Sequence, residues 1–303
     1  MSEVLTNNEA IPTLSVVVVS FNGDKLLEKC LAALVSQPGS EQIEVHVISK
    51  KRRPDGLPGN GGRTPVHWHE IRDTTTIPKM RQLGIERSNA ELLALLEDDC
   101  VVGPNWLQAV LAARNSGHPA IGGPIEPGNF SRGLDWGVFY CEFARFLAPF
   151  SGVVNALPGN NVSYKKKVID QAHIAEGFYE IFFHENLQNE GTELFATNNM
   201  VVTNINSWRF EHCCASPFHH GRAYAGQRFG MKYSARRLVY GLLALLLPIV
   251  KTFRTLRDVH SRKRKELPLF KALPWIIIFQ TCWSAGELAG YFAGPGKSIG
   301  KWR

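Results

Sequence analysis

The chain has 303 residues, of which 44% are hydrophobic and 20% are charged, and this composition excludes a wholly disordered protein. Its net charge of +7 is unevenly distributed, because residues 1–218 contain 18 Lys and Arg against 24 Asp and Glu, whereas residues 219–303 contain 16 against 3. The basic tail therefore suits an anionic partner, either nucleic acid or a membrane surface.

The N-terminal residues, MSEVLTNNEAIPTL, carry acids and asparagine without a basic or a long apolar stretch, so no secretory signal is predicted. The six cysteines show no CxxC spacing. In a chain without an export signal this favours reduced thiols over a zinc site.

The first 115 residues predict a repeated strand and helix pattern. Leu14–Val19 is an apolar, β-branched run of buried-strand type, and apolar residues recur at helical spacing after Asp24, a candidate N-cap. Ile43–Ser49 alternates with period two and predicts a second strand. Further elements are predicted as a strand at 66–71, a helix at about 79–88, a strand at 91–99 and a helix at about 105–114. This order predicts a sheet covered by helices on both faces, whose ligands lie beyond the carboxyl ends of the strands.

Two irregular segments interrupt this pattern. Residues 50–65, KKRRPDGLPGNGGRTP, predict a surface loop that lacks the GxxxxGK[ST] sequence of a Walker-type ATPase. Residues 122–159 are rich in Gly, Pro and aromatic side chains, which either form core or stack on sugar or lipid. The following turn, PGNN, carries Asn160 and Asn161, which are available to sugar hydroxyls or belong to a plain turn.

Three adjacent acids, Glu97, Asp98 and Asp99, end the strand predicted at 91–99. Repulsion and desolvation act against such a cluster unless a cation or water compensates. If the strand persists, Glu97 and Asp99 point to one side and Asp98 to the other. Mg²⁺ and Mn²⁺ take carboxylate oxygens together with substrate phosphates. The cluster is therefore either a turn feature or a divalent-cation site for a nucleotide diphosphate.

Six segments, in this order, resemble the blocks of family 2 glycosyltransferases with the GT-A fold. They are LSVVVVSFNG, PKMRQLGIERSNAELLALLEDDC, PNWL, PGNNVSYKKKVI, GFYE and HHGRAYAG. The resemblance implies an α/β fold with a GT-A-like mixed sheet flanked by helices and a Rossmann-like nucleotide-binding half. It also implies a catalytic domain at 1–218, with a nucleotide-binding part at about 12–115 and an acceptor part at about 116–218. Residues 219–303 then form a basic, apolar, membrane-associated helical region.

The activity implied by this resemblance is a metal-dependent, inverting transfer of a sugar from a nucleotide diphosphate donor, such as a UDP- or GDP-sugar, to a hydroxyl. The acceptor is a saccharide or a lipid-linked molecule, in the synthesis of a cell-envelope glycan, polysaccharide or glycolipid, and the cofactor is Mg²⁺ or Mn²⁺. Where many relatives end the second strand in an Asp that touches the nucleotide, this chain has Ser49, so the base of the nucleotide stays open.

The resemblance also assigns residues. The metal falls to Asp99 and Glu97. The nucleotide and its diphosphate fall to Ser20, Phe21, Asn22, Arg81, Glu97, Asp98, His220 and Arg222. An inverting transfer needs one general base to accept the proton of the acceptor hydroxyl. Alignment with the GFYE block gives this role to Glu180, with Glu185 as the alternative.

Two other functions fit part of the pattern. A nucleotidyltransferase on a related fold usually carries a Gly-rich, basic loop after the first strand, which VSFNGDKLL lacks. A non-catalytic, membrane-associated nucleotide-sugar-binding protein would not need the Glu97, Asp99 and Glu180 set.

The tail carries two apolar runs, Leu238–Val250 and Ala272–Gly286, of 13 and 15 residues. Both are shorter than the roughly 20 residues that span a membrane as a helix. Between them lies a segment with eight Lys and Arg. The pattern favours two interfacial helices on the cytoplasmic face of a membrane, with Trp275, Trp283 and Tyr291 at the depth of the headgroups. A membrane hairpin and soluble core helices are the alternatives, and nucleic acid is disfavoured because aliphatic runs alternate with the basic residues.

Overall fold

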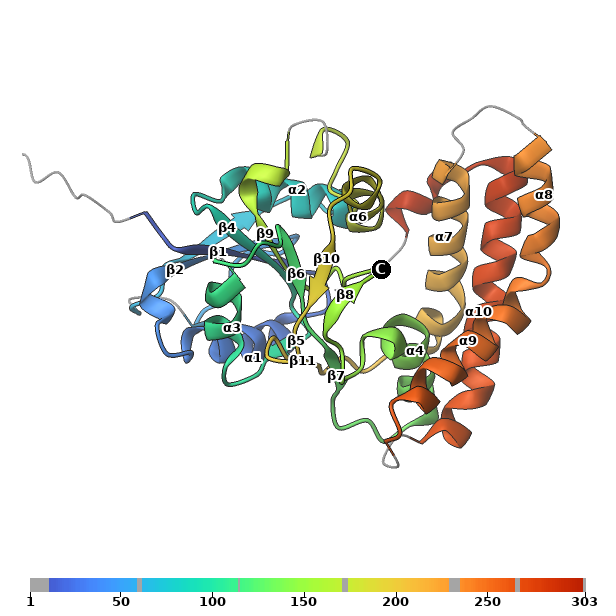
Figure 1. The fold of residues 1–303 in the computed structure, drawn as a ribbon, viewed down its shortest axis with the longest axis horizontal. Helices are drawn as coiled ribbons and strands as arrows, with labels where there is room; N and C mark the ends of the chain where they lie inside the picture. The colour runs from blue at the N-terminus through green and yellow to red at the C-terminus, as the bar shows by residue number, and fades with distance from the viewer. Residues whose placement is uncertain are drawn as a thin grey trace, which may run out of the picture.

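The computed structural model describes residues 11–58, 62–113, 115–170, 174–228, 235–264 and 268–301. An eight-stranded mixed sheet forms its centre, with α1 and α3 on one face and α2 and α6 on the other (Figure 1). The sheet runs in the order β3 (Val66–Glu70), β2 (Ile43–Ser49), β1 (Leu14–Ser20), β4 (Leu92–Glu97), β9 (Asn161–Lys165), β6 (Ala120–Gly122), β10 (Leu194–Ala196) and β8 (Gly152–Val154). A second sheet has the order β5 (Cys100–Val102), β11 (Val202–Asn204) and β7 (Ile125–Pro127).

The described helices divide between the sheet and a separate layer. Those beside the sheets are α1 (Asp24–Val35), α2 (Ile77–Arg87), α3 (Trp106–Ala113), α4 (Gly133–Phe143) and α6 (Glu180–Asn189). Those of the layer are α7 (Phe210–Arg228), α8 (Ala235–Ala244), α9 (Leu247–Ser261) and α10 (Leu269–Ala293). Short 3₁₀ turns are η1 (Ser40–Gln42), η2 (Ala144–Phe146), η3 (Lys166–Val168) and η4 (Gly296–Gly300).

The parallel half of the sheet follows from the apolar runs of the sequence. Strands β1, β2 and β3 and the neighbouring β4 are parallel, and every residue of β1 and β2 is buried, as expected for strands covered on both faces. Because β1 and β4 pair with Val19 opposite Glu97, the loop after β1 and the acids after β4 meet at one edge of the sheet. This edge is where the site lies.

The acidic triplet ends the strand earlier than predicted. Strand β4 stops at Glu97, Asp98 and Asp99 form a turn, and the chain continues into β5 of the second sheet. Helix α1 begins at Asp24 after the N-cap Gly23, so Asp24 is not the N-cap that the sequence suggested. All six cysteines are free thiols.

The helical layer packs directly against the α/β part. Its longest helix, α10, crosses α7 so closely that a Cβ on Gly286 would lie 2.0 Å from the Phe218 carbonyl oxygen, and one on Gly221 would lie 2.3 Å from that of Trp283. Only glycine allows the two backbones to approach in this way. Because α7 runs from Phe210 to Arg228, the expected domain boundary at residue 218 falls inside a continuous helix.

Of the three aromatic side chains expected at a membrane surface, Tyr291 is buried, whereas Trp275 and Trp283 are half-buried. Trp283 lines a cavity, and Trp275 packs on Gly137 of α4. Exposed apolar side chains gather on α8, α9 and the turn between them. They are Leu238, Val239, Tyr240, Leu242, Leu243, Leu245, Leu246, Ile249, Val250 and Phe253, called the apolar face below.

Within the described residues, no single helix is long and apolar enough to cross a membrane. Helices α8 and α9 meet such a criterion only together, by length and composition, and they are bent by 64° where they join. Most of the aromatic residues of 122–159 belong to the core, because Phe139, Tyr140 and Phe146 are buried. Phe143 instead lines the pocket described below.

Candidate active site

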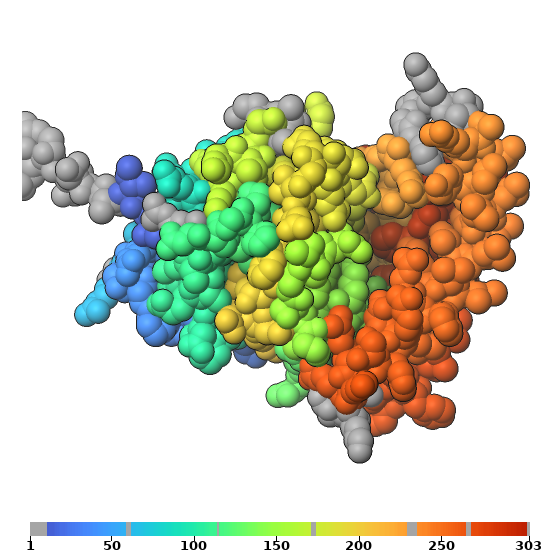
Figure 2. All heavy atoms as spheres, viewed as in Figure 1, coloured from blue at the N-terminus to red at the C-terminus, as the bar shows by residue number. Residues whose placement is uncertain are grey.

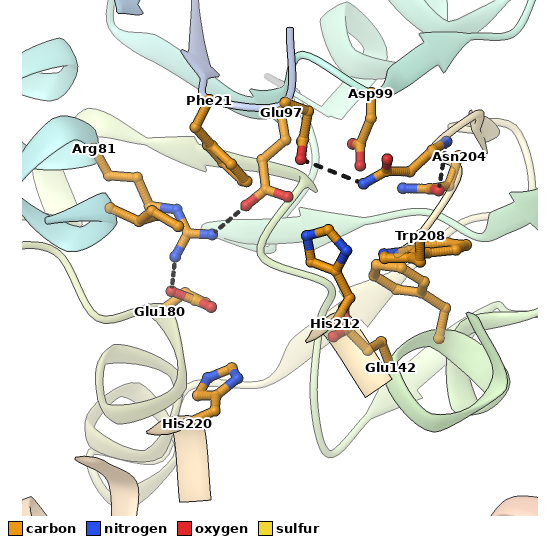
Figure 3. A pocket seen from close by; sticks show the side chains of 14 residues that line it. Phe21, Arg81, Glu97, Asp99, Glu142, Glu180, Asn204, Trp208, His212 and His220 are labelled. Carbon is orange, nitrogen blue, oxygen red and sulfur yellow. Dashed lines mark hydrogen bonds and ion pairs between the residues drawn. The ribbon is translucent and has the colours of Figure 1, made fainter. Parts of the chain in front are cut away.

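A pocket of about 110 Å³ opens at the edge of the sheet where β1 and β4 end (Figure 3). Its walls come from the loop after β1, from α2, the end of β4, α4, α6 and α7, and from the segment after β11. The lining residues are Phe21, Asn22, Ile77, Arg81, Glu97, Asp99, Glu142, Phe143, Glu180, Asn204, Asn206, Trp208, His212 and His220. The pocket therefore joins side chains that are up to 199 positions apart, from Phe21 to His220.

Asp98 points away from this pocket and holds the loop after β1. Its Oδ2 accepts hydrogen bonds from the backbone N–H groups of Phe21, Asn22 and Gly23, at 2.9, 2.8 and 3.3 Å, and from the Ser20 hydroxyl at 3.1 Å. Its Oδ1 accepts one from the Asn22 amide at 2.8 Å. Of the residues assigned to the nucleotide, Ser20 and Asp98 thus fix the loop, and Phe21 and Asn22 line the pocket.

Asp99 is a buried carboxylate whose negative charge is offset by few hydrogen bonds. Burial raises its pKa well above the ordinary value, and the negative charges of Glu97 and Asp98 raise it further. The Cys100 thiol donates a hydrogen bond to Asp99 Oδ1 at 3.3 Å, which lowers the pKa but does not offset burial. A cation would remove this penalty, and oxygen ligands at Asp99 and Glu97 suit Mg²⁺ or Mn²⁺. The residues present therefore fit a divalent ion.

Arg81 connects the two carboxylates of the pocket (Figure 3). Its Nη2 donates to Glu97 Oε1 at 2.9 Å, and its Nη1 donates to Glu180 Oε2. The guanidinium is buried. Burial acts to lower its pKa, but the negative charges of Glu180 and Glu97 outweigh this effect, so the pKa is raised. The backbone N–H of Phe178 donates to the Pro78 carbonyl at 2.8 Å, which places the start of α6 against α2. The ion pairs thus bring Glu180, from the GFYE segment, to the end of β4.

A second cavity of about 530 Å³ adjoins the pocket, between the sheet side and the helical layer. Figure 2 shows the molecular surface hollowed between α6 and the orange helices. Glu142, Phe143, Glu180 and His220 line both the pocket and the cavity, so they form the junction of the two.

Glu142 is the junction carboxylate that the sequence did not single out. Its side chain is exposed to the open space of the pocket and the cavity, which are recessed in the protein. The resulting loss of water, followed by the charge of Glu97, raises its pKa to about 7. No described residue donates a hydrogen bond to it or pairs with it. His220, by contrast, has its pKa lowered to about 3 by burial and by Lys251 and Arg81, so its imidazole is neutral at pH 7.

The remaining predicted residues lie further out. Glu185 lines only the larger cavity. The Arg222 Nε donates to the Gly294 carbonyl at 3.0 Å, so this side chain is turned toward the C-terminal segment and does not line the pocket. Asn161 is buried and accepts from Trp106 Nε1 at 2.9 Å while donating to the carbonyls of Pro124 and Met200, so it has a structural role.

Six lining residues carried no signal in the sequence: Ile77, Glu142, Asn204, Asn206, Trp208 and His212. Asn204 ends β11, which pairs with β5 directly after the acidic turn, and Asn206 and Trp208 follow that strand. Only knowledge of this pairing would have placed them beside Asp99.

A separate cluster of metal-ligand type lies at the start of β2, away from Ser49 and the pocket. Glu44, His46 and His67 each offer one ligand atom, all within 4.8 Å of one another. The Glu44 carboxylate already accepts from the Ser15 hydroxyl at 2.6 Å and from the Asn89 backbone at 2.8 Å, and its hydrogen bonds hold its pKa at about 2 despite burial. These contacts explain the cluster as a buried polar network.

Comparisons with known proteins agree with the α/β fold described above. Residues 15–149 match the family model described as Glycosyl transferase family 2, and a search of curated proteins found no match. The chain is similar in structure to the mannosyltransferase PcManGT from Pyrobaculum calidifontis, solved with GDP-Man and Mn²⁺, with 13% identity and a TM-score of 0.57 over 94% of this chain and 88% of that one. It is also similar to residues 1–349 of S. aureus TarS in complex with UDP-GlcNAc, with 14% identity and a TM-score of 0.51 over 91% of each chain. The predicted GT-A-like mixed sheet flanked by helices is confirmed.

The different surroundings of the two aspartates give opposite expectations for stability. Asp98→Ala removes an acceptor for five donors, three of them backbone N–H groups, and we expect it to lower the free energy of unfolding by about 2–4 kcal/mol. Asp99→Ala removes a buried, repelled carboxylate, and we expect a change within about 1 kcal/mol or a gain. Urea unfolding of the full chain in detergent, without metal, measures both. Equal losses in the two variants would contradict the assignment of Asp98 to the loop and Asp99 to the pocket.

Proposed function

Because residues 15–149 match the model of Glycosyl transferase family 2, we propose that the chain is a glycosyltransferase, with a metal-dependent, inverting transfer of a sugar from a nucleotide diphosphate donor to an acceptor hydroxyl. The observation that carries the proposal is the pocket in which Asp99, Glu97, Arg81 and Glu180 meet at the carboxyl ends of β1 and β4. The two similar structures hold GDP-Man and UDP-GlcNAc, which supports a UDP- or GDP-sugar as donor.

Asp99 and Glu97 are the residues that would hold Mg²⁺ or Mn²⁺. When bound, the ion would neutralise charge on the departing diphosphate. On the protein side, the Arg81 guanidinium is a donor that suits phosphate oxygens as well as carboxylates. The loop that Asp98 holds presents Phe21 and Asn22 to the nucleotide.

The acceptor hydroxyl reaches the sugar at the junction of the pocket and the larger cavity. Its oxygen bonds to the anomeric carbon while the bond from that carbon to the diphosphate breaks, and its proton passes to a carboxylate. Glu180 is our proposed base, because it lies at the junction and matches the family block. In the structure it is held by Arg81, so an anionic donor that engages Arg81 would free its oxygens for the hydroxyl.

Glu142 is the second candidate for the base. It shares the junction, has no partner among the described residues, and its pKa near 7 matches a group that exchanges protons at neutral pH. Glu185 lines the cavity on the acceptor side only.

The apolar face favours a place at the cytoplasmic surface of a membrane, where the chain would act in cell-envelope glycan or glycolipid synthesis. Monomeric soluble proteins rarely expose a continuous patch of so many large apolar side chains. Exposed basic side chains of the same segment are Arg236 on α8 and Lys263 after α9, and such basic side chains complement anionic lipid.

Removing the proposed ligand should abolish metal-dependent donor binding. We expect Asp99→Asn to lose the Mn²⁺-dependent affinity for UDP or GDP, because an amide supplies no charge to the ion. Titration of nucleotide with and without Mn²⁺ measures this, and Asp170→Asn, outside the pocket, is the matched control. An Asp99→Asn protein with unchanged Mn²⁺ dependence would exclude the metal site at Asp99.

Isosteric substitutions assign the base. If Glu180 is the base, Glu180→Gln lowers turnover by roughly 10² to 10⁴, with little change in donor affinity. Glu142→Gln and Glu185→Gln then retain most of the turnover. Single-turnover transfer, or donor hydrolysis where the acceptor is not known, measures all three variants. A large loss in Glu142→Gln beside a small one in Glu180→Gln would move the role to Glu142.

Charge placed on the apolar face should release the protein from membranes. The Ile249→Glu/Phe253→Glu pair changes two side chains that are 73% and 69% exposed and lie one turn apart on α9. We expect at least a tenfold weaker partition onto anionic vesicles, since each apolar side chain contributes about 1.5–3 kcal/mol when buried. Phe210→Glu, on α7 outside the face, is the control in the same sedimentation assay. Wild-type protein that stays in the supernatant without detergent would contradict the proposal.

A further inference from the structure

The polar network around Glu44 leaves one of its buried nitrogen atoms without a hydrogen bond. His46 is 3% exposed, and its Nε2 has no hydrogen-bond partner within the described residues. This atom lies 3.2 Å from Glu44 Oε1, but the two groups lack the alignment of a hydrogen bond. The Glu44 oxygens instead accept hydrogen bonds from Ser15 and Asn89. A buried polar atom in this position requires a partner that the chain does not supply, such as water or an ion.

Two neighbouring strands bring three potential ligand atoms together. Glu44 and His46 are two residues apart on β2 and therefore lie on the same face of the sheet. His67 is opposite His46 in the parallel pairing of β2 with β3, and the centroids of the two imidazole rings are 4.9 Å apart. His67 Nε2 is 3.8 Å from Glu44 Oε2. Each of these side chains thus offers one ligand atom, and the three atoms lie within 4.8 Å of one another.

The hydrogen bonds around the cluster are of the kind that orient metal ligands. An ion bound at His46 Nε2 leaves the ring proton on Nδ1, and this atom is 3.0 Å from His69 Nε2, which can accept it. Glu44 is fixed by the Ser15 hydroxyl at 2.6 Å and by the backbone and side-chain N–H groups of Asn89 at 2.8 and 3.1 Å. Histidine and carboxylate ligands of metal ions are typically held by such outer contacts.

The charge of Glu44 is not taken up by a basic side chain. Within the described residues, Glu44 forms ion pairs only with His46 and His67. Arg87 is the cation whose charge acts on His69, and its Nη1 donates to the Leu83 carbonyl at 3.1 Å. The carboxylate therefore remains available to a cation.

From this geometry we propose a second metal site, formed by Glu44, His46 and His67, that binds Zn²⁺ between β2 and β3. Two imidazoles and one carboxylate suit zinc, whereas Mg²⁺ and Mn²⁺ prefer oxygen ligands. The site is separate from Asp99, because it lies at the start of β2 and the pocket lies at the carboxyl ends of the strands. The His67 side chain is 48% exposed, which gives the ion access from solvent and leaves its fourth position to water.

The proposed ion joins an edge strand to the rest of the sheet. Strand β3 is the first in the order of the eight-stranded sheet, and among the described strands it pairs only with β2. None of its five residues is fully buried. Ligands from both strands on one ion add a link across this pairing, so the zinc-bound form is more stable against unfolding. No nucleotide or acceptor takes part, so the site does not depend on the proposed transfer.

The test measures zinc binding by proteins that all carry Asp99→Asn, which weakens binding of the ion at the pocket. His67→Gln removes the most accessible ligand, and His260→Gln, at an exposed histidine of α9, is the matched control. Calorimetric titration of the full chain in detergent uses ZnCl₂ alone. We expect the Asp99→Asn protein and the control to bind one Zn²⁺ with equal affinity. His67→Gln should weaken this binding at least about 100-fold, because loss of an outer contact alone costs roughly 10- to 100-fold.

Thermal unfolding provides a second readout. Zinc should raise the unfolding midpoint of the Asp99→Asn protein and of the control, and not that of the protein with His67→Gln. The same scans without zinc verify that each variant is folded. A folded His67→Gln protein that binds zinc as tightly as the control overturns the proposal, and so does the absence of zinc binding in the Asp99→Asn protein.

A change outside the ligand set keeps the proposal testable if His67→Gln does not fold. His69→Phe retains a ring but removes the acceptor for His46 Nδ1. We expect it to lower the zinc affinity by roughly 10- to 100-fold. Unchanged affinity in this variant would contradict the proposed orientation of His46 and with it the site.

Discussion

The ion pairs of Arg81 are the interaction on which the site depends. This one buried guanidinium, on α2, joins Glu97 at the end of β4 to Glu180 at the start of α6. Breaking such an arrangement from one side leaves a buried charge without compensation, which is among the costlier changes a protein can undergo. The pairs therefore fix β4 and α6 relative to each other, and they hold Glu180, the proposed base, at the junction of the pocket and the larger cavity.

Around this centre, the protein separates stability from function within three adjacent acids. Asp98 accepts the hydrogen bonds of a loop, whereas Asp99 lacks comparable donors, and burial followed by the charges of Glu97 and Asp98 raises its pKa well above the ordinary value. Such groups are a stability cost that a bound cation can remove. The helical layer closes one side of the pocket, where α7 supplies His220, and the neighbouring α4 supplies Glu142. The narrow pocket and the wider cavity thus meet at a few ionisable side chains.

Local patterns were sufficient to predict the parallel half of the sheet, because β1, β2 and β4 are buried on both faces and read as apolar runs. The acidic triplet and its two-sided geometry were likewise visible, and so was the link between the GFYE segment and the site. The contributions of Glu142, Asn204 and His212 could not be foreseen, since they depend on how β11 pairs with β5 and how α4 and α7 pack. Tyr291, expected at a membrane surface, is buried for the same reason: an amphipathic aromatic suits an interface and a helix–helix contact equally well.

The central claim is that Asp99 and Glu97 hold a divalent ion together with a nucleotide diphosphate. Crystals grown with Mn²⁺ and UDP or GDP, measured at the manganese absorption edge, locate the ion without reference to activity. The account predicts an anomalous peak within roughly 2.0–2.6 Å of a carboxylate oxygen of Asp99, beside the diphosphate. A peak at Glu44, His46 and His67 with none at Asp99 would contradict it.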